Sequence, residues 1–261
     1  MTAILEAARR GSIPVLTILG FIGIWQLLVM LLDVPSWLLP SPVTIWTVFL
    51  KDASMLGRHI VATGVGAVGG LAIGALAGVA LAVLMVRSRL LERILMPLLV
   101  IDQSIPKIAL APIFVIWFGA GMMSRIVIAM VISFFPMIVN TVRGMKSVDP
   151  RVNQLMETLS AKHWHVLTKV RLPNAVPYIF SGLKVAVPLA IIGAVVAEFM
   201  QADSGLGYVV LIAVGNVNTP LVFVAVLLMA ALSLGMFTLV STVEAIILRR
   251  RFAYLALADE R

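Results

Sequence analysis

The chain has 261 residues, of which 61% are hydrophobic and 12% charged, and its mean hydropathy is +1.09. This composition excludes an ordinary soluble protein, in which about half of the residues are apolar and about a quarter are charged, and it indicates an integral membrane protein. The absence of cysteine excludes disulfides and thiolate catalysis, and the net charge of +8 does not indicate nucleic-acid binding, because the basic residues cluster beside long apolar runs.

Six apolar stretches reach the length of about 20 residues that a helix needs to cross a bilayer. They lie at about 12–32, 60–86, 94–118, 124–142, 176–200 and 219–248. The first follows two arginines, as a signal peptide would, but no small-residue cleavage site follows, so we expect a retained helix, with cleavage as the alternative. The pattern predicts an all-α polytopic protein with an N-terminal helix and periplasmic loop (1–56), a core (57–248) and a basic cytoplasmic tail (249–261).

The distribution of basic residues predicts the orientation. With the N-terminus inside, the inner segments hold fifteen of the 20 lysines and arginines. These are Arg9, Arg10, Arg87, Arg89, Arg93, Arg143, Lys146, Arg151, Lys162, Lys169, Arg171, Arg249, Arg250, Arg251 and Arg261. Because cytoplasmic loops carry the excess of positive charge, both termini are expected in the cytoplasm.

Three prolines precede the second apolar stretch, and glycines recur within it. Pro35, Pro40 and Pro42 forbid a continuous helix after the first stretch, which predicts an outer loop with a short interfacial helix. The second stretch then carries a glycine at every fourth position, continued by an alanine: Gly66, Gly70, Gly74, Gly78 and Ala82. Such a face lets a neighbouring backbone approach closely, which favours packing within the bundle, with a homodimer contact as the alternative.

The third stretch contains Pro106 and Pro112, so its helix is expected to be broken, and Lys107 lies inside the break. An ionisable side chain at this depth is a functional candidate, either lining a pathway or pairing with a carboxylate, unless it snorkels to the interface. Glu198 is the first candidate for that carboxylate and Asp102 the second. The alternative interpretation of Glu198 is that it lies at the membrane interface and is solvated.

The tract QADSGLGYVV follows the fifth stretch and combines glycines with polar residues. It predicts an outer gate-like loop with Tyr208 anchored at the interface.

The interval 143–173 is the only long polar segment. Asp149 can cap a helix that begins with Pro150, apolar residues follow at helical spacing, and Pro173 ends the pattern. It predicts an amphipathic, basic cytoplasmic helix system that contacts a partner.

No motif in the chain indicates catalysis. His59, His163 and His165 do not predict a metal site, since two of them point in different directions on a helix and the third belongs to the other side of the membrane. Neither a GxSxG elbow nor a GxxxxGK[ST] phosphate loop is present. If transport is driven by ATP, the ATPase must therefore be another polypeptide.

The segment QLMETLSAKHWHVLTKVRLPNAVPYI resembles the EAA loop of binding-protein-dependent ABC importer permeases of the type I fold. Leu172 and Pro173 match the end of that motif, whereas residues 154–156 replace its EAA and Ser160 replaces its glycine. PSPVTIW, PKIALAPIFVIWFGAG, FFPMIVNTV, VVAEF, GLGYVVLIA and TPLVFVAVL are similar to the branch that imports nitrate, sulfonates and taurine.

The resemblance implies six transmembrane helices, a cytoplasmic coupling helix and a non-catalytic permease subunit of the bacterial inner membrane. Its implied partners are two ATPase subunits that bind the ATP, a second permease copy, expected to form a homodimer, and an external solute-binding protein; no cofactor is expected in this chain. The implied contacts with the ATPase groove are Thr158, Leu159, Ser160, Ala161 and Trp164. Lys107, Glu198 and Asp102 are the hypothesised pathway residues.

Three alternatives stay open at this point. The same machinery can import a heterocycle, such as a pyrimidine precursor of thiamine. An ion-coupled secondary transporter would use Lys107, Glu198 and Asp102 as a relay. A membrane scaffold would use the cytoplasmic helix only to recruit a partner.

Overall fold

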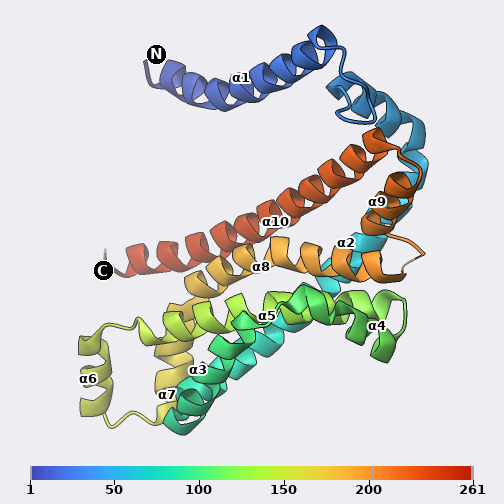
Figure 1. The fold of residues 1–261 in the computed structure, drawn as a ribbon. Coiled ribbons are helices and arrows are strands. Elements are labelled where there is room, and N and C mark those ends of the chain that lie inside the picture. The colour runs from blue at the N-terminus through green and yellow to red at the C-terminus, as the bar shows by residue number, and fades with distance from the viewer. Residues whose placement is uncertain (1, 202, 260–261) are drawn as a thin grey trace.

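The computed structural model describes the backbone of residues 2–201 and 203–259, and the side chains of residues 16–200 and 203–249. Every regular element in this part of the chain is a helix (Figure 1). In chain order the elements are α1 (Thr2–Leu31), α2 (Pro42–Arg87), α3 (Arg89–Ser104), the 3-10 helix η1 (Lys107–Leu110), α4 (Ala111–Phe118), α5 (Met122–Lys146), α6 (Pro150–Thr158), α7 (His163–Val166), the π-helical η2 (Leu167–Arg171), α8 (Leu172–Gln201), α9 (Leu206–Gly215) and α10 (Thr219–Asp259).

The membrane-spanning helices match the expected stretches. Four helices are long and apolar enough to cross a bilayer: α2, α5, the continuous run from α7 to α8, and α10. Helix α3 and the η1–α4 segment are bent by 85° where the prolines predict a break, and they add a fifth crossing if the bent pair is counted as one span rather than as a re-entrant loop. The apolar part of α1 with described side chains, Leu16–Leu31, is shorter than a full span. The all-α, multi-spanning architecture is confirmed, and the number of six spans stays a prediction.

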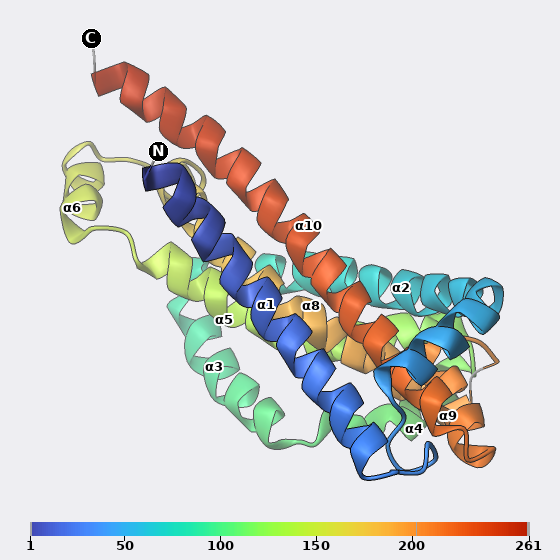
Figure 2. The same cartoon turned by 90° about the horizontal axis from the view of Figure 1, so that it is seen from above.

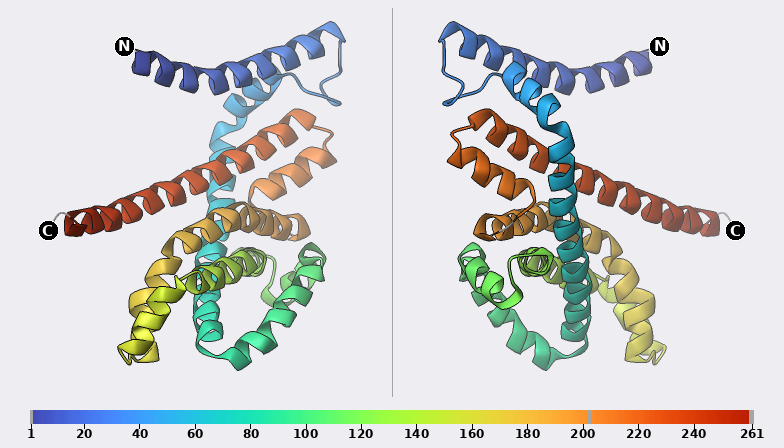
Figure 3. Two further views of the ribbon diagram at one scale, coloured as in Figure 1. Left: turned by 90° about the vertical axis from the view of Figure 1, so that its left-hand side faces the viewer. Right: turned by 90° about the vertical axis from the view of Figure 1, so that its right-hand side faces the viewer.

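Helix α2 is longer than the sequence suggests. Ser41 caps it, accepting a hydrogen bond from the Thr44 N–H at 3.2 Å, and Pro42 occupies its first turn. Its 46 residues correspond to about 69 Å. The expected interfacial helix is therefore not a separate element but the start of α2, since no further helix breaker follows Pro42. Figure 3 shows α2 running past α5, α8 and α10.

The glycine face of α2 packs against α5. A Cβ atom on Gly70 would lie 2.4 Å from the Ala129 Cβ and 2.7 Å from the Ile126 carbonyl oxygen. Gly74 and Gly78 meet α5 equally closely one and two turns further along. The interpretation as packing within the bundle is confirmed, and the chain's own α5 occupies the face that a homodimer contact would need.

Small buried residues bring α8 into the same core. Ala186, Ala190 and Ala194 of α8 lie in one buried cluster with Ala67 of α2 and Ala129 of α5. Helix α1, by contrast, lies apart from this core along most of its length (Figures 1 and 3). The start of α1 and the end of α10 lie at the end of the molecule that carries α6, and α4 and α9 lie at the opposite end (Figures 1 and 2).

We predict that Gly70→Ala destabilises the bundle by about 1–3 kcal/mol, because the added methyl group collides with the α5 backbone, which cannot move aside cheaply. Gly57→Ala is the matched control on the same helix, since a Cβ there meets nothing within 4 Å. Thermal unfolding of both variants in one detergent measures the difference. Equal melting temperatures for the two variants would contradict the tight α2–α5 contact.

Candidate functional site

The polar interval begins with a capped helix, as predicted. The Arg151 N–H donates to the Asp149 Oδ1 atom at 2.8 Å, and Pro150 occupies the first turn of α6. The cap satisfies one of the N–H groups that a helix start leaves without an internal partner. It holds the first turn of α6 in place next to the end of α5.

The interval does not remain helical up to Pro173, so that prediction is wrong. Helix α6 ends at Thr158, and a turn containing Ser160 separates it from α7. Pro173 instead lies in the first turn of α8, within a helical run that begins at His163. Proline has no N–H to donate, and the π-helical segment directly before it, where the α-helical bonding pattern already changes, accommodates it.

Ser160 adopts a backbone conformation that favours glycine. Its φ angle is +49°, in the left-handed region, which costs about 1–2 kcal/mol for a residue with a side chain. This is the position at which the resembled motif carries glycine. The conformation thus supplies a physical reason for a glycine there, and the chain forms the same turn with serine.

The five residues expected to couple to an ATPase lie together at this turn. Thr158 ends α6, residues 159–161 form the turn, and Trp164 lies in the first turn of α7. Leu159 is 64% exposed and Trp164 is 60% exposed. Two large apolar side chains exposed beside one turn are typical of a contact surface for a partner.

Lys107 lies at the bend between α3 and α4 and pairs with Asp102. Its Nζ atom is 2.6 Å from the Asp102 Oδ2 atom and 5.8 Å from the centre of the Phe135 ring. The Lys107 side chain is only 13% exposed, so it does not snorkel outward, whereas the Asp102 side chain is 41% exposed. The choice of Glu198 as the first candidate partner of Lys107 is therefore wrong, and the second candidate is the one observed.

Glu198 is fully buried at the other end of α8. One carboxylate oxygen accepts a hydrogen bond from the Thr63 hydroxyl at 2.8 Å, and the other accepts one from the Gly207 N–H at 2.8 Å. The Arg125 Nε atom lies 3.9 Å from the carboxylate. The alternative of a solvated interfacial position is wrong. Sequence patterns missed Thr63 and Arg125, which lie 135 and 73 positions away in the chain.

In the loop expected to be gate-like, residues 203–207 form a turn that closes over Glu198. The Leu206 N–H donates to the Thr63 Oγ1 atom at 2.8 Å, and the Gly205 N–H donates to the His59 Nδ1 atom at 3.0 Å. A Cβ atom on Gly205 would lie 2.1 Å from the Glu198 carboxyl carbon, and its φ of +109° also requires glycine. One carboxylate thus joins α2, α5, α8 and the start of α9.

Two further side chains complete this outer cluster. The Arg125 guanidinium donates to the Ser204 hydroxyl at 3.0 Å and approaches Asp203 at 3.5 Å. Tyr208 is half-buried, with its ring centre 5.8 Å from that of His59. Among residues 16–200 and 203–249, no group of three or more His, Asp or Glu side chains is placed to hold a metal ion.

We predict that Glu198→Ala destabilises the protein by about 3–5 kcal/mol, because it removes the buried carboxylate beside the Arg125 side chain and leaves the Thr63 hydroxyl and the Gly207 N–H without their acceptor. Asp203→Ala removes a carboxylate from the same arginine, but its side chain is 90% exposed, so the loss is at most about 1 kcal/mol. Melting temperatures in one detergent separate the two variants. A similar loss in both would show that burial of Glu198 does not matter.

The chain is similar to known proteins both as a member of a family and in individual relatives. The family model described as "Binding-protein-dependent transport system inner membrane component" matches residues 70–252. This range includes the glycine face of α2 from Gly70 onward, the turn at Ser160 and the Glu198 cluster of α8 and α9.

Three relatives are similar over most of their length. The formylaminopyrimidine transport permease protein ThiX of Halalkalibacterium halodurans is 36% identical over 90% of this chain and 94% of its own. The riboflavin transport system permease protein RibX of Chloroflexus aurantiacus is 34% identical over 91% of this chain and 89% of its own. The putative aliphatic sulfonates transport permease protein SsuC of Bacillus subtilis is 32% identical over 89% of this chain and 85% of its own.

Proposed function

Because the chain belongs to the family of binding-protein-dependent transport system inner membrane components, we propose that it forms the translocation pathway of an ATP-driven importer of a small solute. It contributes no ATP hydrolysis of its own. Two ATPase subunits bind the ATP, a second copy of this chain completes the pathway as a homodimer, and an external binding protein delivers the solute. The observation that carries the proposal is the exposed turn at Ser160, in register with the coupling motif of such permeases.

The proposed orientation places α6 and both termini in the cytoplasm of a bacterial cell, with the chain in the inner membrane. Two observations support it. The start of α1, the end of α10 and α6 lie at the same end of the molecule (Figure 1). The inner segments assigned on this basis hold fifteen of the 20 basic residues, as the positive-inside rule requires.

The helix from His163 to Met200 supports a mechanism for coupling. It begins beside the exposed turn and ends two residues beyond Glu198, so it connects the proposed ATPase contact with the outer cluster directly. Its 38 residues span about 57 Å. When the ATPases close and draw the turns of the two copies together, this helix tilts and transmits the movement outward, with the π-helical segment and Pro177 and Pro188 as the points where it can bend.

The solute proposed first is a small anion such as nitrate, a sulfonate or taurine, in agreement with the relative named for aliphatic sulfonates. A heterocycle is the second candidate. It is favoured by the pairing of Lys107 with Asp102, which removes the free positive charge that would select an anion. The names of the relatives for formylaminopyrimidine and riboflavin agree with this candidate.

The two other classes of function, an ion-coupled secondary transporter and a membrane scaffold, find little support. A relay through Lys107, Asp102 and Glu198 would need contact between its members, but Lys107 and Asp102 bind each other, and the described contacts of Glu198 are with Thr63, Gly207 and Arg125. A scaffold without transport activity disagrees with membership of a transport family.

We predict that Ser160→Arg abolishes copurification of the ATPase with the tagged chain, because a long charged side chain fills the turn that is proposed to enter the ATPase groove. Deletion of residues 158–164 has the same effect. Ser54→Arg, an exposed position on α2 at the other end of the molecule, is the matched control and retains the ATPase. Copurification that survives both coupling variants would overturn the proposed contact.

We predict that Lys107→Ala lowers uptake of the solute at least tenfold while the complex still assembles. The double variant Lys107→Ala/Asp102→Ala removes the unpaired carboxylate that the single change leaves behind, so it separates a pathway role from simple pairing. Uptake of labelled taurine and labelled formylaminopyrimidine measures both variants and both solute candidates. Full uptake by the double variant would show that the Lys107–Asp102 pair has only a structural role.

A further inference from the structure

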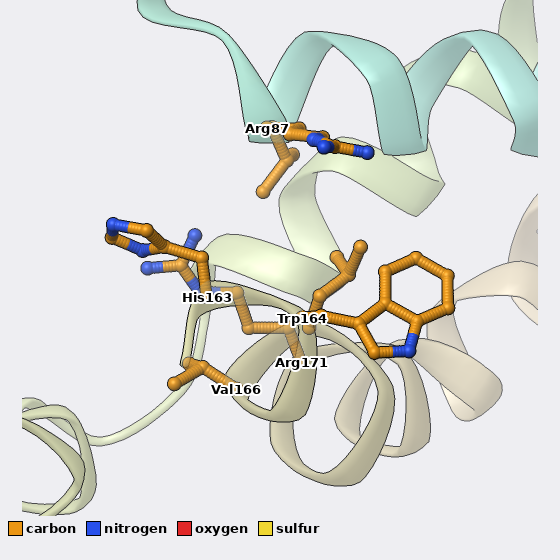
Figure 4. A pocket seen from close by; sticks show the side chains of 7 residues that line it. Arg87, His163, Trp164, Val166 and Arg171 are labelled. Carbon is orange, nitrogen blue, oxygen red and sulfur yellow. The ribbon is translucent and has the colours of Figure 1, made fainter. Parts of the chain in front are cut away.

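A basic cavity lies between the end of α2 and the start of the α7–α8 helix. Its volume is about 250 Å³, and its lining combines three basic side chains with apolar ones. The lining residues are Val86, Arg87, His163, Trp164, Val166, Leu167 and Arg171. In Figure 4, Arg87 projects from one side, and His163, Trp164, Val166 and Arg171 project from the facing helical segment.

The cavity lies at the level where the membrane-spanning helices end. Arg87 is the last residue of the first long span, and His163 is the first residue of the span that continues into α8. Within these long helices, Arg87 directly follows the apolar stretch at 60–86, and Arg171 lies five residues before the apolar stretch at 176–200. The ends of apolar stretches meet the headgroup region of a bilayer, which is where phospholipid phosphates are found. Trp164 lines the same cavity with its indole ring, a side chain that is enriched at membrane interfaces.

The positive charges of the cavity are not neutralised within the described part of the chain. Lys146 pairs with Glu92, and Lys184 pairs with Glu244. No ion pair with a described carboxylate involves Arg87 or Arg171. Two guanidinium groups facing one cavity without an acid favour an anion as its occupant, and the planar guanidinium fork matches the oxygens of a phosphate.

The remaining lining points to the kind of anion. Val86, Val166 and Leu167 make part of the wall apolar, and a free inorganic ion gains nothing from such a wall. A phospholipid presents a phosphate and, directly next to it, an apolar glycerol and acyl region. Basic pockets between transmembrane helices are known to accept lipid headgroups of this type.

We propose that the cavity between Arg87 and Arg171 binds a phosphate-bearing anion, namely the headgroup of an anionic phospholipid such as phosphatidylglycerol. The bound headgroup holds the end of α2 against the start of the α7–α8 helix. Since Trp164 also belongs to the exposed turn region, the lipid stiffens the segment through which the turn is attached to the membrane. The proposal rests on the membrane-spanning fold and does not depend on the transported solute.

The test measures lipid binding to the purified full-length chain in detergent by native mass spectrometry. Phosphatidylglycerol is titrated against phosphatidylcholine, and inorganic phosphate serves as a competitor. The wild type is expected to bind phosphatidylglycerol more tightly than phosphatidylcholine. The double variant Arg87→Gln/Arg171→Gln is expected to lose about 25-fold in affinity for phosphatidylglycerol, from about fivefold for each arginine near a lipid surface.

Arg58→Gln is the matched control, because it removes an exposed charge from the other end of the same helix and does not touch the cavity. It is expected to leave the tightest phosphatidylglycerol site unchanged. Competition by millimolar inorganic phosphate that depends on both arginines would support the phosphate site but identify a free anion as its ligand. Equal affinity of wild type and double variant for phosphatidylglycerol would overturn the proposal.

Copurification of the ATPase distinguishes a lipid from a protein partner as the occupant of the cavity. If the double variant loses the copurifying ATPase while its lipid binding stays as in the wild type, an acidic segment of the ATPase occupies the cavity and the proposal is wrong. If lipid binding falls and the ATPase is retained, the lipid site is supported independently of the coupling contact.

Discussion

The close approach of α2 and α5 is the contact on which the rest of the structure depends. In a bilayer, apolar side chains gain little by leaving lipid for protein, so helices associate by dense packing of their backbones. The glycine face of α2 permits this packing, and its first member also makes room for Arg125: a Cβ on Gly66 would lie 3.0 Å from the arginine Cβ. The same face therefore packs two helices and places a buried cation at their outer end.

The buried cation and Glu198 together define the outer end of the core. A lone carboxylate in this environment would be costly, but three donors or charges from α2, α5 and α9 surround it. Gly205 is required there because the carboxylate occupies the space that a side chain would need, and Gly207 because the Glu198 Cβ atom and the Val195 carbonyl oxygen do. The other end of α8 has the opposite character, with an exposed turn, a π-helical segment and basic side chains. A single helical run joins the rigid outer cluster to this exposed inner segment.

Local chemistry accounts for the predictions that succeeded. Asp149 and Pro150 start α6, and the glycine spacing packs α2 in the bundle, since each feature acts within a few residues or along one helix face. The predictions of where a helix ends were less reliable. Pro173 does not end a helix, because the π-helical segment directly before it accommodates a residue without an N–H. The break comes instead after α6, at a turn in which Ser160 adopts a left-handed backbone that residues with a side chain disfavour.

The sequence by itself determined that this is an all-helical membrane protein, where its long apolar stretches lie, and that its polar interval resembles the coupling motif of importer permeases. Hydrophobic length, helix caps and motif spacing are properties of the chain read in order. Only the tertiary structure decided that Lys107 pairs with Asp102, that Glu198 is buried against Thr63 and Arg125, and that Arg87 faces Arg171 across a cavity. These partners come from helices distant in sequence, and the packing of those helices, not the spacing of residues along the chain, determines which polar groups meet.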